Sequence, residues 1–222
     1  MPLIKEKERE ALRKELSQRM VDEVRLIVFT QDVPCLFCTE TVQVASELAE
    51  LSPKIKLEVY DFVHDQMKAT ELRIDKIPAT AVVGRKDHGI RFYGVPSGYE
   101  FNSLVGAIQD VSRGESGLSQ KTKEAMKELD QPVHLQVFVT PTCPYCPSAV
   151  RLAHKLAIES DMVWADMVEA NEFVHLAQRH QVAGVPKTII NDNFEVAGAV
   201  PEDLLVAHVL HAAHHIGPVQ PR

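Results

Sequence analysis

Apolar and polar residues follow a pattern along this chain that occurs twice. Short apolar runs at 26–30 and 135–140 are rich in Leu, Val and Phe, which favours buried strands. Longer stretches repeat apolar residues every three or four positions and predict amphipathic helices. These predicted helices cover residues 39–51, 66–73, 101–112, 148–159, 172–181 and 201–215, and a further charged helix opens each half. Additional strands are predicted near 81–83, 90–93, 189–190 and 194–197.

The two halves are related by an internal repeat with an offset of 108 residues. At this offset Ile74–Thr80 aligns with Val182–Thr188, and both segments lead into an apolar strand. The segment Arg113–Leu118 is the richest in Gly and Ser near the middle of the chain, so we place a boundary there, with units at 1–115 and 116–222. Alternating strands and helices predict parallel pairing, and the short last connection predicts an antiparallel hairpin. The expected fold class is α/β, with a central mixed sheet flanked by helices in each unit.

Composition and charge narrow the class of protein. The formal charge of −7 disfavours nucleic acid as a partner, because nucleic-acid binding normally needs a basic face. No apolar run approaches the roughly 20 residues that span a bilayer, and the charged segment Met1–Glu10 lacks the apolar stretch of a signal peptide. Four cysteines in 222 residues are too few for a disulfide-stapled secreted scaffold. We therefore expect a cytoplasmic protein with no membrane or nucleic-acid partner.

All of the cysteine lies in two Cys-x-x-Cys pairs, Cys35/Cys38 and Cys143/Cys146. Each pair follows a predicted strand and begins a predicted helix, whose unpaired N–H groups and dipole lower the pKa of a thiol from its usual value of about 8.5. The first cysteine of each pair is therefore the expected exposed nucleophile. The second lies in the first helical turn and is expected to resolve the mixed disulfide that the first one forms. All four are candidate catalytic residues, and Cys143/Cys146 is expected to be the more active pair.

A proline follows the first cysteine of each pair at the same distance of 43 positions, Pro78 in one half and Pro186 in the other. The motif at 143–146, Cys-Pro-Tyr-Cys, resembles the glutaredoxin active site, and Ile77–Thr80 and Val185–Thr188 resemble the cis-proline loop of the thioredoxin superfamily. Two such units in tandem, each with an intact dithiol, resemble the glutaredoxin-like protein disulfide oxidoreductases of thermophilic archaea and bacteria.

This resemblance implies two thioredoxin folds and dithiol–disulfide exchange on protein substrates. It also implies cis peptide bonds before Pro78 and Pro186, and a role for these prolines, with Ile77 and Val185, in binding the substrate backbone. Tyr145, beside the sulfurs, is a further candidate substrate contact. The chain lacks a G-x-G-x-x-G nucleotide fingerprint, so electrons are expected from an external reductase, such as a thioredoxin-reductase-like flavoprotein, or from a small thiol. No cofactor or metal beyond the redox-active dithiols is expected.

Two of the places where the chain departs from the superfamily bear on its chemistry. Many thioredoxins carry a buried Asp six residues before the first cysteine, and here Phe29 and Val137 occupy those positions. Glutaredoxins usually bind glutathione through a two-glycine turn, whereas Ala197–Asp203 keeps one glycine. The sequence therefore identifies no internal base and leaves the use of glutathione open.

Other interpretations of the pairs remain. Four cysteines can form a tetrahedral zinc site, but the 104 residues between Cys38 and Cys143 far exceed the spacing of a zinc ribbon. The fold could instead serve as a non-catalytic binding protein, or as a dedicated electron-transfer module for one reductase or peroxidase partner. His208, His211 and His215 share a face of the last predicted helix, and we interpret them as an exposed face rather than a metal site. The sequence does not determine the direction of electron flux.

Overall fold

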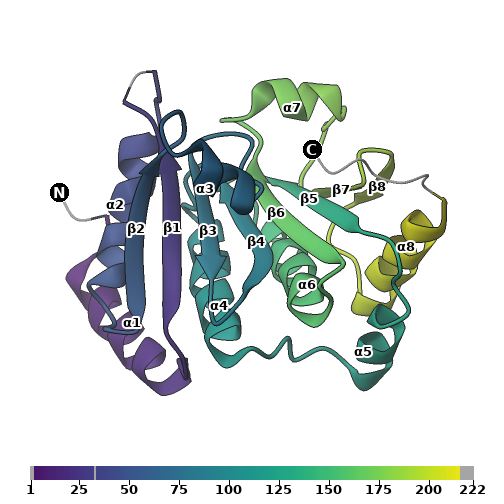
Figure 1. Cartoon of the computed structure of the whole chain (residues 1–222), viewed down its shortest axis with the longest axis horizontal. Helices are drawn as coiled ribbons and strands as arrows, with labels where there is room; N and C mark the ends of the chain where they lie inside the picture. The colour runs from purple at the N-terminus through teal and green to yellow at the C-terminus, as the bar shows by residue number, and fades with distance from the viewer. Residues whose placement is uncertain (1–2, 33, 216–222) are drawn as a thin grey trace.

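The computed structural model describes residues 3–32 and 34–215, and the elements of both halves follow the predicted order (Figure 1). The first half comprises α1 (Glu6–Arg19), β1 (Val24–Thr30), α2 (Cys38–Ala49), β2 (Ile55–Asp61), α3 (Gln66–Glu71), β3 (Ala79–Val83), β4 (Asp87–Tyr93) and α4 (Glu100–Arg113). The second half comprises α5 (Gln120–Met126), β5 (Val133–Val139), α6 (Cys146–Glu159), β6 (Val163–Glu169), α7 (Val174–Arg179), β7 (Lys187–Ile190), β8 (Phe194–Ala197) and α8 (Glu202–His215). The proposed unit boundary falls in the connection between α4 and α5 and stays a prediction.

The strands of the two halves form one continuous sheet, in the order β2-β1-β3-β4-β6-β5-β7-β8. The halves meet where β4 pairs in parallel with β6, from Ile90↔Ala165 to Tyr93↔Val168. The sequence pattern describes each half by itself and does not predict this junction. Because β1, β4, β6 and β5 run in the same direction, β1 and β5 end at the same end of the sheet. The two cysteine pairs, which follow these strands, therefore open at one end of the molecule.

The predicted parallel pairing is confirmed for β1 with β2 and for β5 with β6. The strands that follow α3 and α7 are antiparallel instead, which corrects the prediction for these two connections. Strand β3 pairs antiparallel with β1, and β7 pairs antiparallel with β5. Helix α3 has six residues, so it extends only about 9 Å, whereas a seven-residue strand such as β2 spans about 23 Å. The helix is too short to return the chain along the sheet, so β3 starts at the end where β2 stops.

Helices α3 and α7 are shorter than predicted because the chain turns left-handed at equivalent positions of the repeat. Arg73 has a φ of 54° and Gln181 a φ of 49°. In both halves the next residue donates its N–H to a carbonyl five positions earlier, at 2.8 Å. Such a bond closes a helix end and satisfies a carbonyl that has no further helical partner.

Successive side chains along the strands point to opposite faces of the sheet and belong to two separate hydrophobic cores. In β1, Leu26 and Val28 belong to the larger core, to which α2, α4, α6 and α8 contribute. Ile27 and Phe29 point to the other face and belong to the smaller core, which includes Ala69 of α3. Helices α3 and α7 both lie at the upper end of the sheet in Figure 1. The sheet is therefore covered on both faces, as the fold class predicts.

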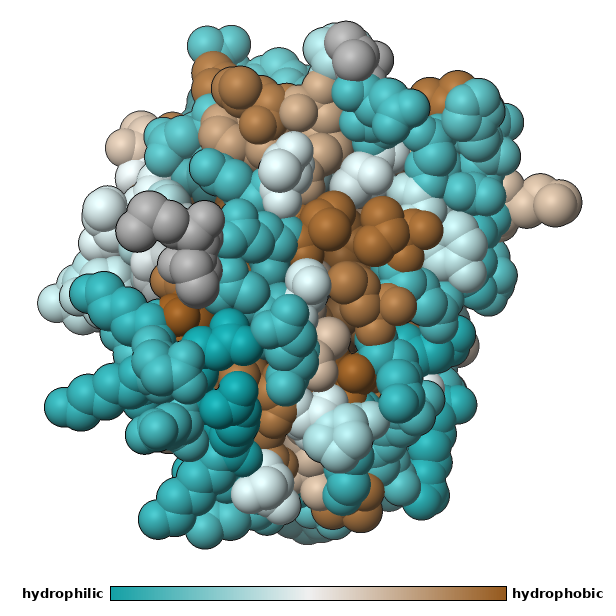
Figure 2. All heavy atoms as spheres, turned by 90° about the vertical axis from the view of Figure 1, so that its left-hand side faces the viewer, coloured by the Kyte–Doolittle hydropathy of each residue, from teal (hydrophilic) through white to brown (hydrophobic). Residues whose placement is uncertain are grey.

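The outer edge of the first half is formed by β2. Figure 2 looks onto this side of the molecule and shows mostly hydrophilic residues, with apolar residues gathered near the middle of the face. Val59 of β2 is 49 % exposed, so the edge strand presents some apolar surface.

In the described part of the chain no helix is both long and apolar enough to cross a membrane.

Candidate active site

Both cysteine pairs lie at a junction between a buried strand and a helix. Cys35 follows β1 and Cys38 is the first residue of α2, while Cys143 follows β5 and Cys146 is the first residue of α6. Each pair forms a disulfide, and the Cα atoms of its two cysteines are 5.5 Å apart. As predicted, the two-residue spacer brings both sulfurs of a pair to the N-terminus of one helix.

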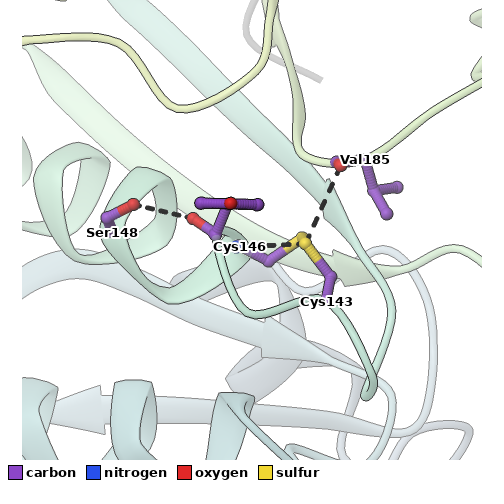
Figure 3. Close-up of a disulfide and its surroundings, with 5 residues drawn as sticks. Cys143, Cys146, Ser148 and Val185 are labelled. Atoms are coloured by element: carbon purple, nitrogen blue, oxygen red, sulfur yellow. Dashed lines mark hydrogen bonds between the residues drawn. A yellow bond between two sulfur atoms is a disulfide. The ribbon is translucent and has the colours of Figure 1, made fainter.

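The backbone around Cys143 is arranged to stabilise a thiolate. The Cys146 N–H, at the start of α6, points at Cys143 Sγ over an N–S distance of 3.1 Å. The Val185 carbonyl oxygen lies 3.7 Å from the same sulfur (Figure 3). An N–H in the first helical turn has no intrahelical partner and favours negative charge on the sulfur. The carbonyl can accept the proton of the neutral thiol, so reduced Cys143 has a partner in either protonation state.

The first cysteines are less open than expected, and they differ from one another. Cys35 is half-buried, whereas Cys143 is only 8 % exposed. The carbonyl of Val185 is one of the groups that lie against the Cys143 sulfur. The spacers are open instead, with Leu36 84 % exposed and Tyr145 70 % exposed. The second cysteine of each pair is buried, which fits a resolving thiol that needs no direct access to substrate.

Both proline loops have the geometry that the resemblance implies. The peptide bonds that precede Pro78 and Pro186 are cis. The Pro78 carbonyl accepts the N–H of Gly94 at 3.0 Å, and the Pro186 carbonyl accepts the N–H of Gly198 at 2.8 Å. Both prolines are buried. Each loop is therefore tied to the turn that follows the last strand of its own half.

The predicted substrate contacts are divided between the two sites. At the second pair, the Val185 carbonyl lies against Cys143 Sγ, Pro186 follows Val185, and Tyr145 precedes α6 with most of its side chain exposed. In the first half, Ile77 and Pro78 occupy the equivalent positions of the repeat. A role in binding substrate stays a prediction for all five residues.

A buried carboxyl lies beside the segment that leads into the second pair. Glu100, the first residue of α4, is 2 % exposed, and neither of its oxygens has a hydrogen-bond partner among the described residues. The adjacent Tyr99 donates its backbone N–H to the carbonyl of Pro141 at 3.0 Å. Burial, which disfavours the charged form, raises the pKa of Glu100 to about 7. Pro141 shortly precedes Cys143 along the chain, so Glu100 is a candidate for tuning this site.

Nothing in the sequence pattern marks Glu100 as a functional residue. An acidic residue in the first turn of a helix is ordinarily an exposed group that stabilises the helix dipole. At the positions where many thioredoxins have a buried Asp, Phe29 and Val137 are 0 % and 1 % exposed. The buried carboxyl of Glu100 therefore belongs to the other half of the chain, and its link to the second pair runs through the bond of Tyr99 to Pro141 and the packing of α4 against α6.

Replacing Glu100 by Gln is expected to remove part of the pH dependence of stability. The carboxyl pKa rises from its usual 4.5 to about 7 on folding, so the group stabilises the fold fully below about pH 4.5 and loses this contribution as the pH rises through 7. Relative to the variant, the wild-type free energy of unfolding should fall by up to about 3 kcal/mol between pH 5 and pH 8.5. Urea unfolding at both pH values measures this difference. A difference that is constant with pH would contradict the burial of the charge.

The geometry does not support a metal centre in the part of the chain that is described. No group of three or more His, Cys, Asp or Glu side chains there is placed to hold a metal ion. Each cysteine is paired within its own half, so the four do not converge on a shared zinc site. On α8, the rings of His211 and His215 stack with centroids 4.0 Å apart.

Comparisons with known proteins place this geometry among thioredoxin folds. A family model described as a thioredoxin domain matches residues 133–211. The crystal structure of a protein disulfide oxidoreductase from Aeropyrum pernix is 34 % identical, with a TM-score of 0.89, over 95 % of this chain and 94 % of that one. The NTD_N/C domain of alkylhydroperoxide reductase AhpF from Enterococcus faecalis is 26 % identical, with a TM-score of 0.85, over 92 % of this chain and 99 % of that one.

The matching curated proteins are longer, and this chain aligns with only a part of each. The F subunit of alkyl hydroperoxide reductase from Staphylococcus epidermidis is 30 % identical over 135 residues, which is 60 % of this chain and 24 % of that protein. An NADH dehydrogenase from Bacillus subtilis is 25 % identical over 154 residues, which is 68 % of this chain and 28 % of that protein. The chain thus spans about a quarter of the length of these curated relatives.

Proposed function

The chain belongs to the thioredoxin-fold protein disulfide oxidoreductases, and from this premise we propose that it exchanges thiols and disulfides on a range of protein substrates through both cysteine pairs. Its general class, a thiol–disulfide oxidoreductase with two Cys-x-x-Cys motifs, follows from the family and the two disulfides. The observation that carries the proposal is the contact of the Cys146 N–H with Cys143 Sγ at 3.1 Å. A sulfur held in this way at a helix start is suited to react as a thiolate.

In the reducing direction, the Cys143 thiolate attacks one sulfur of a substrate disulfide. A bond forms between Cys143 Sγ and that sulfur, the substrate S–S bond breaks, and the leaving thiolate takes a proton from water. Cys146 then loses its proton, and its thiolate attacks Cys143 Sγ, which closes the internal disulfide and releases the second substrate thiolate. Two electrons have then passed to the substrate. In the oxidising direction the same steps run in reverse, and the redox poise of the compartment sets the direction.

Substrate binding in this proposal uses the surface around each sulfur. An extended substrate segment lies beside the Val185–Pro186 loop, and the exposed ring of Tyr145 packs against it. The loop Ile77–Pro78 serves the first pair in the same way. Such contacts depend mainly on backbone and on one aromatic ring, so they suit a protein that accepts many sequences.

A dedicated electron-transfer module is the second function we consider, because the NTD_N/C domain of AhpF has a TM-score of 0.85 with this chain. In this case the two pairs pass electrons between a thioredoxin-reductase-like flavoprotein, or a small thiol, and one fixed partner. Both functions are compatible with the cytoplasmic location that we propose. The third alternative, a non-catalytic binding protein, does not account for the N–H placed on Cys143 Sγ.

Insulin reduction distinguishes these functions. A protein disulfide oxidoreductase is expected to accelerate the precipitation of insulin chains when dithiothreitol supplies the electrons, well above the rate with dithiothreitol alone. The matched control is the same protein, reduced and then alkylated at its cysteines. A dedicated module is expected to leave the rate at that of dithiothreitol alone, and this outcome would contradict the proposal of general protein substrates.

A further inference from the structure

A second carboxyl, that of Glu172, comes from the second half and is hydrogen-bonded to the first half next to the proline loop of the first pair. Glu172 lies between β6 and α7, in the second half. Its Oε1 accepts the backbone N–H of Val95 at 2.8 Å. Gly94, the preceding residue, donates its own N–H to the carbonyl of Pro78 at 3.0 Å. One turn of backbone therefore connects a carboxyl of the second half to the cis-proline of the first.

Gly94 allows this close approach. Its φ is +93°, and a Cβ at this position would lie 2.9 Å from Glu172 Cδ and 2.8 Å from Glu169 Cβ. Any side chain at position 94 would displace the carboxyl. The other oxygen of Glu172, Oε2, is buried and has no hydrogen-bond partner in the described part of the chain. An unpaired buried oxygen destabilises a fold, so this carboxyl is not placed for stability alone.

The charged groups that act on Glu172 come from both halves, and they are acidic. Glu169, at the end of β6, accepts the backbone N–H of Glu172 at 2.6 Å. Glu40 lies in the first turn of α2, two residues after Cys38. Burial is the main cause that raises the pKa of Glu172 to about 7, the charges of Glu169 and Glu40 raise it as well, and the N–H of Val95 lowers it. A carboxyl that responds to Glu40 lies within electrostatic reach of the helix start that holds the first pair.

We infer that Glu172 is a positioning residue for the first pair, whose ionisation controls the reactivity of Cys35 from the opposite half of the molecule. This inference rests on the proposed function of Cys35 as a nucleophile. When Glu172 is ionised, its charge disfavours a second negative charge at the start of α2 and lowers the fraction of Cys35 present as thiolate. When Glu172 is protonated, this repulsion disappears. The two halves are thereby coupled through a titration near neutral pH.

The alkylation rate of Cys35 by iodoacetamide tests this inference. A full-length variant with Cys38→Ser, Cys143→Ser and Cys146→Ser leaves Cys35 as its single thiol. Between pH 5.5 and pH 9, its rate profile is expected to show an inflection near 7 from Glu172 in addition to the titration of the thiol. Adding Glu172→Gln retains an oxygen to accept the N–H of Val95 but removes the charge. The inflection should then vanish, and the rate at pH 8 should rise about threefold.

The controls separate electrostatic coupling from loss of structure. Glu10→Gln removes one charge from an exposed position of α1 and should leave the profile of the parent variant unchanged. Thermal unfolding shows whether the Glu172→Gln variant is folded. If it is not folded, the test rests on the pH–rate profile of the single-thiol parent variant. A parent profile with only one inflection would overturn the inference. If the alkylation rate of Cys35 has the same pH profile with Glu and with Gln at position 172, the coupling is overturned but the proposed function is not. A Cys35 that does not react at any pH overturns the proposed function, and the coupling with it.

Discussion

Replacing Cys143 by Ser is expected to lower insulin-reduction turnover by about tenfold or more. A serine hydroxyl does not ionise near neutral pH and cannot form the mixed disulfide, so the second pair loses its nucleophile. The effect should exceed that at the first pair because the Cys146 N–H lies 3.1 Å from Cys143 Sγ and the exposed Tyr145 directly precedes Cys146 at the start of α6. Steady-state turnover with insulin, under equal concentrations of dithiothreitol, measures the loss.

The matched control for this substitution is Cys35→Ser, which removes the equivalent sulfur of the repeat. It should leave a larger share of the turnover than Cys143→Ser. If Cys143→Ser retained turnover near that of the wild type, the assignment of Cys143/Cys146 as the more active pair would be wrong. A larger loss from Cys35→Ser than from Cys143→Ser would assign the main activity to the first pair.

Replacing Gly98 by Ala is expected to reduce the free energy of unfolding by about 3 kcal/mol. Gly98 has a φ of +58°, and a Cβ there would lie 2.2 Å from the carbonyl oxygen of Pro141, a backbone atom. The loop must move away, which breaks the hydrogen bond from the Tyr99 N–H to the same carbonyl. Because Pro141 shortly precedes Cys143, the alkylation rate of Cys143 should change as well. Urea unfolding measures the change in stability.

Gly117 provides a matched control for this substitution. It has a similar φ of +67°, but no described atom lies within 4 Å of a Cβ built on it. Gly117→Ala should therefore reduce the free energy of unfolding only by the backbone strain of an alanine in the left-handed region, about 1 kcal/mol. Equal losses of stability for the two variants would show that the loop at Gly98 does not press on Pro141.

Much of each half could be predicted from its sequence, because the relevant signals are local. The apolar run before each pair predicts a strand that the structure confirms as β1 and β5. The cis bonds before Pro78 and Pro186 are confirmed as well, although that prediction came from resemblance. A local pattern does not distinguish cis from trans at an X-Pro bond, where trans is the more common form.

The features that join the halves could not be predicted, because they depend on packing between distant segments. The apolar residues Ile90 and Phe92 of β4 have the pattern of a buried strand whichever strand lies beside it, so pairing with β6 leaves no mark in the sequence. The bond between Glu172 of the second half and the Val95 N–H of the first half likewise depends on how the halves pack. The contact of Cys143 Sγ with the Val185 carbonyl also joins positions 42 residues apart in the chain.

The reduction potentials of the two pairs, measured separately, test the central hypothesis most directly. The pairs are isolated in the Cys35→Ser/Cys38→Ser and Cys143→Ser/Cys146→Ser variants and equilibrated in glutathione buffers. Exchange-competent sites are expected to have potentials between about −270 and −120 mV, and a gap between the two would indicate electron transfer from one half to the other. Potentials well below about −270 mV for both pairs would mark stable structural disulfides and would contradict a role in thiol–disulfide exchange.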